Sequence, residues 1–151
     1  MLSSWLIRGA DVLDIGPASS HPDAGAVTPA EEIARLQGVW SLLKALPAGL
    51  SVDSFQIETQ RWAIAHGTDW LNDINGFAEP SLYDELADAS CQLVVMHAIQ
   101  SKGIARRAPA PDGDIWDHIL RFFETRLKVL GDAGIARDRL VIDPGMGFFL
   151  G

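Results

Sequence analysis

Residues 141–149 read V-I-D-P-G-M-G-F-F, and this stretch decides the fold. A short apolar run ends at Asp143, and Pro144 prevents the run from continuing as a central strand. Gly145 and Gly147 then allow the backbone to bend closely around whatever the acid faces. The pattern predicts a strand with a carboxylate at its tip, although one such motif taken alone is equally compatible with an ordinary turn.

Four segments upstream share this design. Each is an apolar or β-branched run that ends in a polar residue, and a segment with helical spacing separates each run from the next. Strands that alternate with helices in this way are typical of an α/β barrel, whose chemistry lies at the carboxyl-terminal rim of the strands. The predicted strands are 11–15, 50–53, 70–74, 93–97 and 141–143.

These five predicted strands are fewer than the eight of a closed (β/α)8 barrel, which takes about 200 residues or more. An open sheet of this size would leave two unpaired edges and an apolar inner face. The chain is therefore either a smaller open α/β fold or the middle of a larger protein. Residues 1–8 read as the end of a helix and Gly151 falls in a loop, which favours the second interpretation. We expect residues 1–151 to form a single partial domain of the TIM (β/α)8 class, an incomplete barrel.

Composition narrows the class of protein. The chain has 151 residues, of which 48% are hydrophobic and 21% charged, as is ordinary for one globular domain. A net charge of −8 argues against a nucleic-acid surface. The single cysteine, Cys91, excludes an intrachain disulfide and a cysteine-based metal cage, which fits a reducing cytoplasm. No apolar run is as long as a membrane span, which takes about 18 residues, and the N-terminus lacks the apolar region of a signal peptide. We therefore expect a cytoplasmic protein without nucleic-acid or membrane partners.

Helix signals fill the segments between the strands. T-P-A-E at 28–31 combines an N-cap threonine, a proline at the first helical position and a glutamate that completes a capping box. Further helices are predicted near 56–66, 81–87 and 114–130. The long connection 98–113 is typical either of a lid on a barrel rim or of a segment that is merely mobile.

Convergence of the strand tips would create one polar pocket. The carboxylates of Asp53 and Asp143 and the carboxamide of Asn72 would face it, with Met96 as an apolar wall. Such a set suits a flat, neutral heterocycle with several N–H donors, because a carboxylate accepts two parallel N–H bonds and asparagine both donates and accepts. It suits a metal less well, since no His-x-His or glutamate cluster accompanies it. His97 follows Met96, and by alternation it should point the other way, which favours a structural hydrogen bond over the alternative of a direct role in the site.

The loop after the first strand, 16–23, reads G-P-A-S-S-H-P-D. Its density of turn formers is compatible with a plain surface loop. The alternative is an anion site, in which the hydroxyls of Ser19 and Ser20, the backbone N–H groups and His21 act as donors.

Five segments together resemble dihydropteroate synthase: D-V-L-D-I-G-P-A-S-S-H-P, S-V-D-S-F, L-N-D-I-N-G-F, V-V-M-H and V-I-D-P-G-M-G-F, in the family's order. Their details are more similar to the mobile sulfonamide-resistance branch than to the housekeeping branch. The resemblance implies a TIM-barrel transferase of folate biosynthesis. It would join 6-hydroxymethyl-7,8-dihydropterin diphosphate to p-aminobenzoate, with release of diphosphate, with the help of Mg²⁺ and as a homodimer when full length.

The resemblance also implies roles for individual residues. Asp143 and Asn72 would hydrogen-bond the pterin ring, while Asp53 would bind the ring and stabilise the positive charge that develops as diphosphate leaves. The pterin slot would be lined by Ile74, Met96, Gly147 and Phe148. The diphosphate would be held by Ser19, Ser20 and His21, with serine and histidine in the last two positions where the family usually has threonine and arginine.

Two departures from the family pattern carry further expectations. Phe149 and Leu150 stand where many housekeeping members have glycine and lysine, and this bulkier pair would reshape the pocket against sulfonamides.

The family's metal-associated asparagine would precede Met1, while a lysine for the pterin and an arginine and histidine for the diphosphate would follow Gly151. We therefore expect no useful turnover from the 151 residues alone.

Two other functions stay open on sequence alone. Another pterin-binding barrel, such as a methyltetrahydrofolate methyltransferase, also presents acids and asparagine to a pterin, although the S-S-H-P loop argues against it because that reaction has no diphosphate to hold. A non-catalytic α/β binding module would have to be a soluble monomer that melts cooperatively, whereas a fragment should aggregate or bind hydrophobic dyes.

Overall fold

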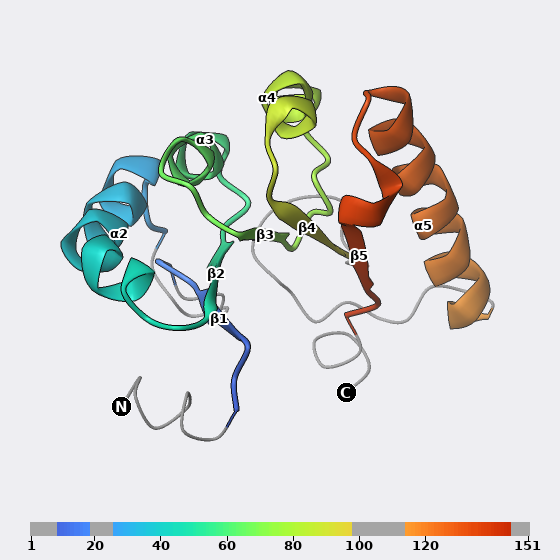
Figure 1. Ribbon diagram of the computed structural model, residues 1–151. Helices are drawn as coiled ribbons and strands as arrows, with labels where there is room; N and C mark the ends of the chain where they lie inside the picture. Colours follow the sequence, from blue (N-terminus) through green and yellow to red (C-terminus); the bar gives the residue numbers. More distant parts are fainter. Residues whose placement is uncertain (1–8, 19–25, 98–113, 146–151) are drawn as a thin grey trace.

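The computed structural model describes residues 9–18, 26–97 and 114–145. Within them, parallel strands form one five-stranded sheet in the order β1-β2-β3-β4-β5, which is also their order along the chain. The helices that connect the strands all lie on the same face of the sheet (Figure 1). The elements are β1 (Val12–Ile15), α2 (Pro29–Lys44), β2 (Gly49–Asp53), α3 (Ile57–Ala65), β3 (Trp70–Asp73), α4 (Tyr83–Asp88), β4 (Gln92–Met96), α5 (Ile115–Asp132) and β5 (Leu140–Asp143).

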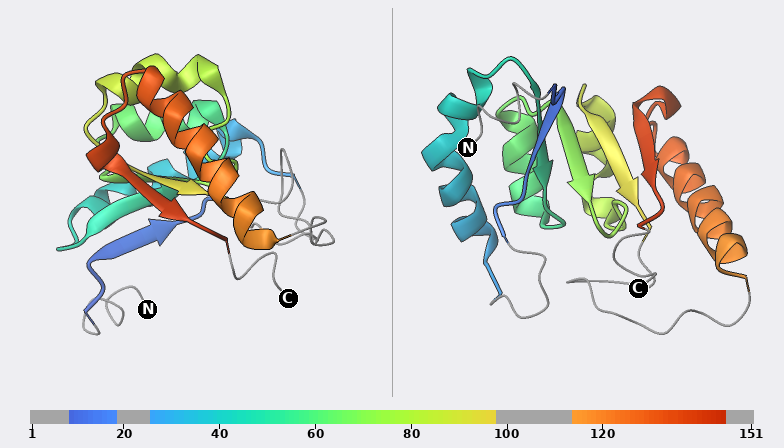
Figure 2. Two further views of the ribbon diagram at one scale, coloured as in Figure 1. Left: turned by 90° about the vertical axis from the view of Figure 1, so that its right-hand side faces the viewer. Right: turned by 90° about the horizontal axis from the view of Figure 1, so that it is seen from below.

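This arrangement is the repeating unit of a barrel. Consecutive parallel strands lie side by side, and each helix crosses back over the same face, which the two views in Figure 2 show from the side and from below. The five predicted strands and the predicted helices are confirmed to within a few residues. The expected helix end at 1–8 and the long connection 98–113 lie outside the described residues.

Alternation along the strands separates an apolar face from a polar one. The central strands place almost fully buried apolar side chains on the helix-covered face: Leu50, Val52, Leu71, Leu93 and Val95. The other face carries the polar side chains of the strand ends, together with Val12 and Val141, which are each 39% exposed. Among the described residues, nothing comparable to the helix layer covers this second face.

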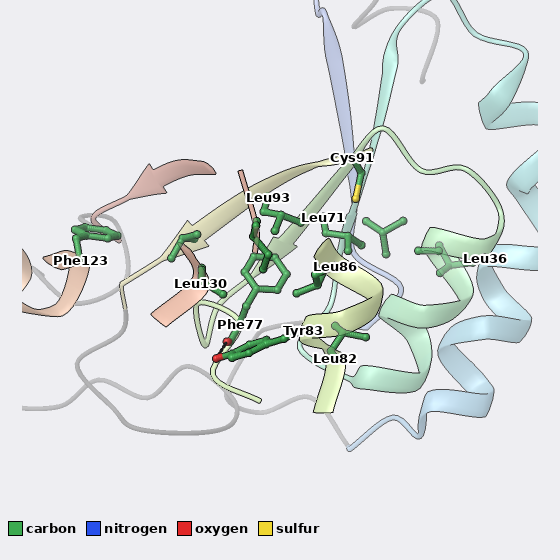
Figure 3. Packing of buried hydrophobic residues seen from close by; sticks show 14 of the residues in the cluster. Leu36, Leu71, Phe77, Leu82, Tyr83, Leu86, Cys91, Leu93, Phe123 and Leu130 are labelled. Carbon is green, nitrogen blue, oxygen red and sulfur yellow. Dashed lines mark hydrogen bonds between the residues drawn. The ribbon is translucent and has the colours of Figure 1, made fainter. Parts of the chain in front are cut away.

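Apolar side chains from the strands and helices form one core (Figure 3). Leu86 and Leu130 bring α4 and α5 onto the sheet and are fully buried, as are Leu71 and Leu93 beneath them. Burial of this kind contributes about 1.5–3 kcal/mol for each large side chain. Cys91 is buried in the same core, and burial raises the pKa of its thiol.

The helices begin and end where the sequence indicates. α2 starts with the predicted capping box: the Glu31 N–H donates to Thr28 Oγ1 over 3.3 Å, and the Thr28 N–H donates to the Glu31 carboxylate over 2.8 Å. Gly67 and Gly134 follow α3 and α5 with positive φ angles of 72° and 89°, which glycine adopts without strain. None of the helices in the described ranges is both long and apolar enough to cross a bilayer.

Replacing Thr28 by alanine should lower the free energy of unfolding by about 1 kcal/mol, because the Glu31 N–H at the start of α2 loses its hydroxyl acceptor. Urea denaturation measures this difference. Thr28→Ser is the matched control, since it keeps the hydroxyl acceptor. Equal stability of Thr28→Ala and the parent protein would show that the capping box contributes nothing measurable.

Candidate active site

The polar strand ends gather at one edge of the sheet, as predicted. Asp53 at the end of β2 is in register with Asn72 at the end of β3, and Met96 at the end of β4 is in register with Asp143 at the end of β5. Partners in a parallel pair share a face, so these four side chains project from the face that the helices leave uncovered. The four residues therefore share one rim, and the pocket that they would line stays a prediction.

Asn72 is held by Asp14, a residue to which the sequence assigned no role. Asn72 Nδ2 donates to Asp14 Oδ2 over 3.1 Å. A carboxylate can only accept, so the amide must turn its nitrogen to Asp14 and its oxygen the other way. None of the described residues donates to the Asn72 Oδ1, although this oxygen is buried. A buried acceptor of this kind is suited to a ligand N–H group.

Asp53 lies among other acids in a partly buried position. Burial, followed by the negative charges of Asp14, Asp73 and Glu32, raises the pKa of the Asp53 carboxyl to about 7. The loop after β1 passes close to this group: a Cβ built on Gly16 would lie 3.7 Å from Asp53 Oδ2. Near neutral pH the carboxyl is thus poised between its neutral and charged forms, which is typical of a functional acid.

Asp143 occupies the turn that the opening motif predicts. Its Oδ1 accepts from the Gly145 N–H over 2.8 Å, and Gly145 has a φ of 70°, which favours glycine. Its backbone carbonyl accepts from the His97 N–H over 2.8 Å, which joins the ends of β4 and β5. Within the described residues the second carboxylate oxygen, Oδ2, accepts no hydrogen bond.

His97 supports this turn from the helix-covered side. The ring is buried, and its Nδ1 lies 3.3 Å from the carbonyl oxygen of Pro144. A carbonyl only accepts, so Nδ1 carries the proton and Nε2 accepts from His118 Nδ1 over 3.1 Å. Burial lowers the pKa of His97, which favours this neutral form. The predicted structural role of His97 is confirmed.

Ile74 follows β3 and is buried, and the loop that carries it is held by Asp73. Asp73 Oδ1 accepts from the Asn75 N–H over 2.7 Å, and Oδ2 accepts from the Phe77 N–H over 3.2 Å. Phe77 has a φ of 56°, a costly conformation for a bulky residue that these contacts fix. Burial raises the pKa of Asp73, with the hydrogen bonds acting in the opposite direction. The sequence alone assigned no function to Asp73.

The remaining predicted site residues lie outside the described ranges. These are Ser19, Ser20 and His21 of the anion loop, and Gly147, Phe148 and Phe149 beyond the last strand. One described contact bears on the anion loop: Arg35 Nη1 of α2 donates to the carbonyl oxygen of Pro17 over 2.7 Å. This brings a permanent positive charge next to the start of that loop, which the sequence patterns did not indicate.

The described side chains do not build a metal centre. Across the ranges that the structure covers, no three His, Cys, Asp or Glu side chains gather in a way that could hold a metal ion. The acids of the site are instead engaged with the Asn72 amide and with backbone N–H groups. This donor set fits a ligand rich in N–H groups better than a divalent cation.

The described residues form parallel βα units with their helices on one face of the sheet, which is part of an α/β barrel. Acids and an amide lie at the strand ends, on the rim where such barrels carry their chemistry. The family model described as pterin binding enzyme matches residues 2–151, and the chain belongs to this family.

Individual relatives agree with that assignment. The chain is 53% identical over 146 residues to dihydropteroate synthase type-2 of Escherichia coli. The matched region covers 97% of this chain and 54% of the relative. A crystal structure of Burkholderia cenocepacia dihydropteroate synthase complexed with 7,8-dihydropteroate matches with a TM-score of 0.87 and 34% identity over 97% of this chain and 52% of that one. The Xanthomonas albilineans dihydropteroate synthase with 4-aminobenzoic acid matches with a TM-score of 0.84 and 36% identity, over 97% of this chain and 51% of that one.

The predicted fold class is thus confirmed: the chain is part of a TIM barrel of the dihydropteroate synthase type. It spans about half the length of the curated relatives it matches.

Proposed function

We propose that this chain is the pterin-binding part of a dihydropteroate synthase, a transferase of folate biosynthesis. The substrates would be 6-hydroxymethyl-7,8-dihydropterin diphosphate and p-aminobenzoate. The observation that carries the proposal is the buried Asn72 Oδ1, which none of the described residues satisfies, in register with Asp53. The ligands named for the matched Burkholderia and Xanthomonas structures, 7,8-dihydropteroate and 4-aminobenzoic acid, support the same substrate class.

The proposed recognition uses acceptors only. Asn72 Oδ1 and the carboxylates of Asp143 and Asp53 would accept N–H bonds from the pterin ring, while Asp14 would keep the Asn72 amide in its orientation. A ring that donates several hydrogen bonds leaves fewer buried acceptors unpaired than an analogue that lacks them. Ile74 and Met96 would supply the apolar sides of the slot.

The proposed reaction is a substitution at the exocyclic methylene carbon of the pterin. The bond from this carbon to the diphosphate oxygen breaks, diphosphate departs with the electron pair, and the p-aminobenzoate nitrogen forms the new bond and loses one proton. The ionised Asp53 would stabilise the positive charge that develops on the pterin, an effect that is large in a site shielded from water. No covalent intermediate with the protein is required.

The remaining components of the proposal are the anion loop, the metal and the assembly. Ser19, Ser20 and His21 would bind the diphosphate, with the Arg35 charge nearby. Mg²⁺ would assist the diphosphate as a leaving group, but the described residues do not fit a metal site by themselves. The full-length enzyme would be a cytoplasmic homodimer.

The test is an assay of the complete reading frame that contains this chain, obtained by sequencing the source DNA across both ends. We expect the purified product to form 7,8-dihydropteroate from the two substrates, and the 151 residues alone to show no useful turnover. Absence of turnover with tight binding of methyltetrahydrofolate would favour the methyltransferase-type alternative. Cooperative melting of the 151 residues as a monomer, without pterin binding, would favour a non-catalytic module.

A change at Phe149 should alter sulfonamide inhibition of the full-length enzyme. If the bulky Phe149 side chain reshapes the approach of p-aminobenzoate, Phe149→Gly should lower the inhibition constant for sulfamethoxazole by about tenfold or more, which corresponds to about 1.4 kcal/mol. The KM for p-aminobenzoate, measured in parallel, is expected to change less. Equal sulfonamide inhibition of the variant and its parent would argue against this role.

A further inference from the structure

A single buried amide lies behind the two predicted pterin ligands of β2 and β3. Gln60 on α3 is only 2% exposed. Its Nε2 donates to the carbonyl oxygen of Ser54 over 2.7 Å and to Asp73 Oδ2 over 3.0 Å. A carboxamide nitrogen carries two hydrogens, so both donors of the group are used.

The two acceptors belong to residues that directly follow the predicted pterin ligands Asp53 and Asn72. Ser54 directly follows Asp53, and Asp73 directly follows Asn72. The Ser54 N–H also donates to the backbone oxygen of Asn72 over 3.1 Å, at the end of the ladder between the strands. Gln60 therefore spans the ends of β2 and β3 just beyond the point where their backbone pairing stops.

Further buried contacts make this support rigid. Ser54 Oγ donates to Glu32 Oε2 of α2 over 2.7 Å and accepts from the Gln56 N–H over 3.1 Å. Asp73 in turn holds the loop with Ile74 and the left-handed Phe77. A buried polar network of this kind favours one arrangement, because an alternative would leave buried donors or acceptors without partners.

We propose that Gln60 is a positioning residue for pterin recognition: its amide fixes the spacing between Asp53 and Asn72 without touching the ligand. The inference rests on the proposed function of this site. Loss of the amide would leave the Ser54 carbonyl and the Asp73 carboxylate short of donors, and the two strand ends would separate to reach water. The pterin acceptors would then no longer be presented together, whereas p-aminobenzoate, which by the proposed function would approach near Phe149, would be affected less.

The test uses the full reading frame with Gln60→Met, which keeps the length and volume of the side chain, and Gln60→Glu, which keeps its shape but replaces the donors by acceptors. Thr59→Val is the matched control: Thr59 is the adjacent residue on α3, it is fully buried, and its hydroxyl oxygen has no partner among the described residues. Melting temperatures are measured first, and kinetics are recorded well below the lowest of them.

We expect each Gln60 variant to raise the KM for the pterin diphosphate by about tenfold and to change the KM for p-aminobenzoate by less than about twofold. Thr59→Val should change neither KM value. Equal pterin KM values for a folded Gln60 variant and the parent would overturn the inference, as would equal rises in both KM values or failure of both variants to fold. If the parent neither binds nor converts the pterin diphosphate, the proposed function itself fails, and this result is distinct from the others.

Discussion

Asp53→Asn is expected to lower kcat/KM for dihydropteroate formation by about 100-fold to 1,000-fold and, at the same time, to stabilise the protein at pH 8. The loss of activity follows because a neutral amide cannot stabilise the charge that develops on the pterin, and one such electrostatic group commonly contributes a factor of this size. The gain in stability follows from the raised pKa of Asp53, about 7, which reflects burial and the neighbouring acids Asp14, Asp73 and Glu32.

The sign of the pH effect follows from proton linkage. The folded protein holds a proton on Asp53 up to about pH 7, whereas the unfolded chain loses it near the ordinary value of 3.8. Between these values the folded state binds more protons, so the contribution of Asp53 to stability falls as pH rises through this window. Asp53→Asn removes this penalty, and the variant should exceed its parent by about 1–3 kcal/mol at pH 8 and by little near pH 4.

Two measurements on the full-length protein check this prediction. Urea denaturation at both pH values gives the stability difference, and kcat/KM as a function of pH should rise through about pH 7 in the parent as Asp53 ionises. A variant that loses activity but is less stable than its parent at pH 8 would show that Asp53 is a structural acid. A pH profile that is flat through neutrality would show that its ionisation is irrelevant to the reaction.

Gly76→Ala should be among the most destabilising single changes, with a loss of about 2–4 kcal/mol of unfolding free energy. Gly76 has a φ of 60°, and a Cβ at this position would lie 3.0 Å from both the Met96 carbonyl oxygen and the Phe122 ring. The strain of a left-handed alanine therefore adds to a clash with backbone that cannot move easily. Urea denaturation measures the loss.

Gly38→Ala is the matched control for this prediction. Gly38 lies inside α2, and a Cβ there would meet nothing within 4 Å. Alanine should stabilise this helix by about 0.5–1 kcal/mol, because glycine loses more conformational freedom on folding. Similar effects of the two substitutions would contradict the close approach of Gly76 to the Met96 carbonyl oxygen and the Phe122 ring.

The sequence was sufficient for the strands and for the acids at their ends. Alternation of apolar residues and the Gly and Pro residues beyond them located each strand, and parallel strands necessarily bring their carboxyl ends to one edge. Asp53, Asn72 and Asp143 could therefore be assigned to a common rim before any tertiary contact was known.

The hydrogen bonds that Gln60, Glu32 and Asp14 make next to the strand ends could not be predicted in this way. Gln60 and Glu32 are polar residues of helices to which the sequence patterns assigned no role, yet both are almost fully buried. Their burial depends on how each helix rotates against the tip of a particular strand, which local periodicity does not encode. The same holds for the Asp14 contact to Asn72, because it joins side chains that are 58 residues apart.

The left-handed Phe77 was likewise beyond sequence reasoning. Local preference alone argues against a positive φ for a bulky residue, and the conformation is compatible with folding only because Asp73 holds its N–H and Tyr83 donates to its carbonyl over 3.0 Å. Tertiary contacts override the local preference at this loop, which lies next to the predicted pterin slot.

The most direct test of the central claim is a crystal structure of the full-length protein with 7,8-dihydropteroate. We expect ring N–H groups of the pterin within about 3.2 Å of Asn72 Oδ1 and of the Asp53 and Asp143 carboxylates, with the Asn72 amide still bound to Asp14. A pterin bound away from this rim, or an Asn72 oxygen that stays unpaired in the complex, would contradict the account.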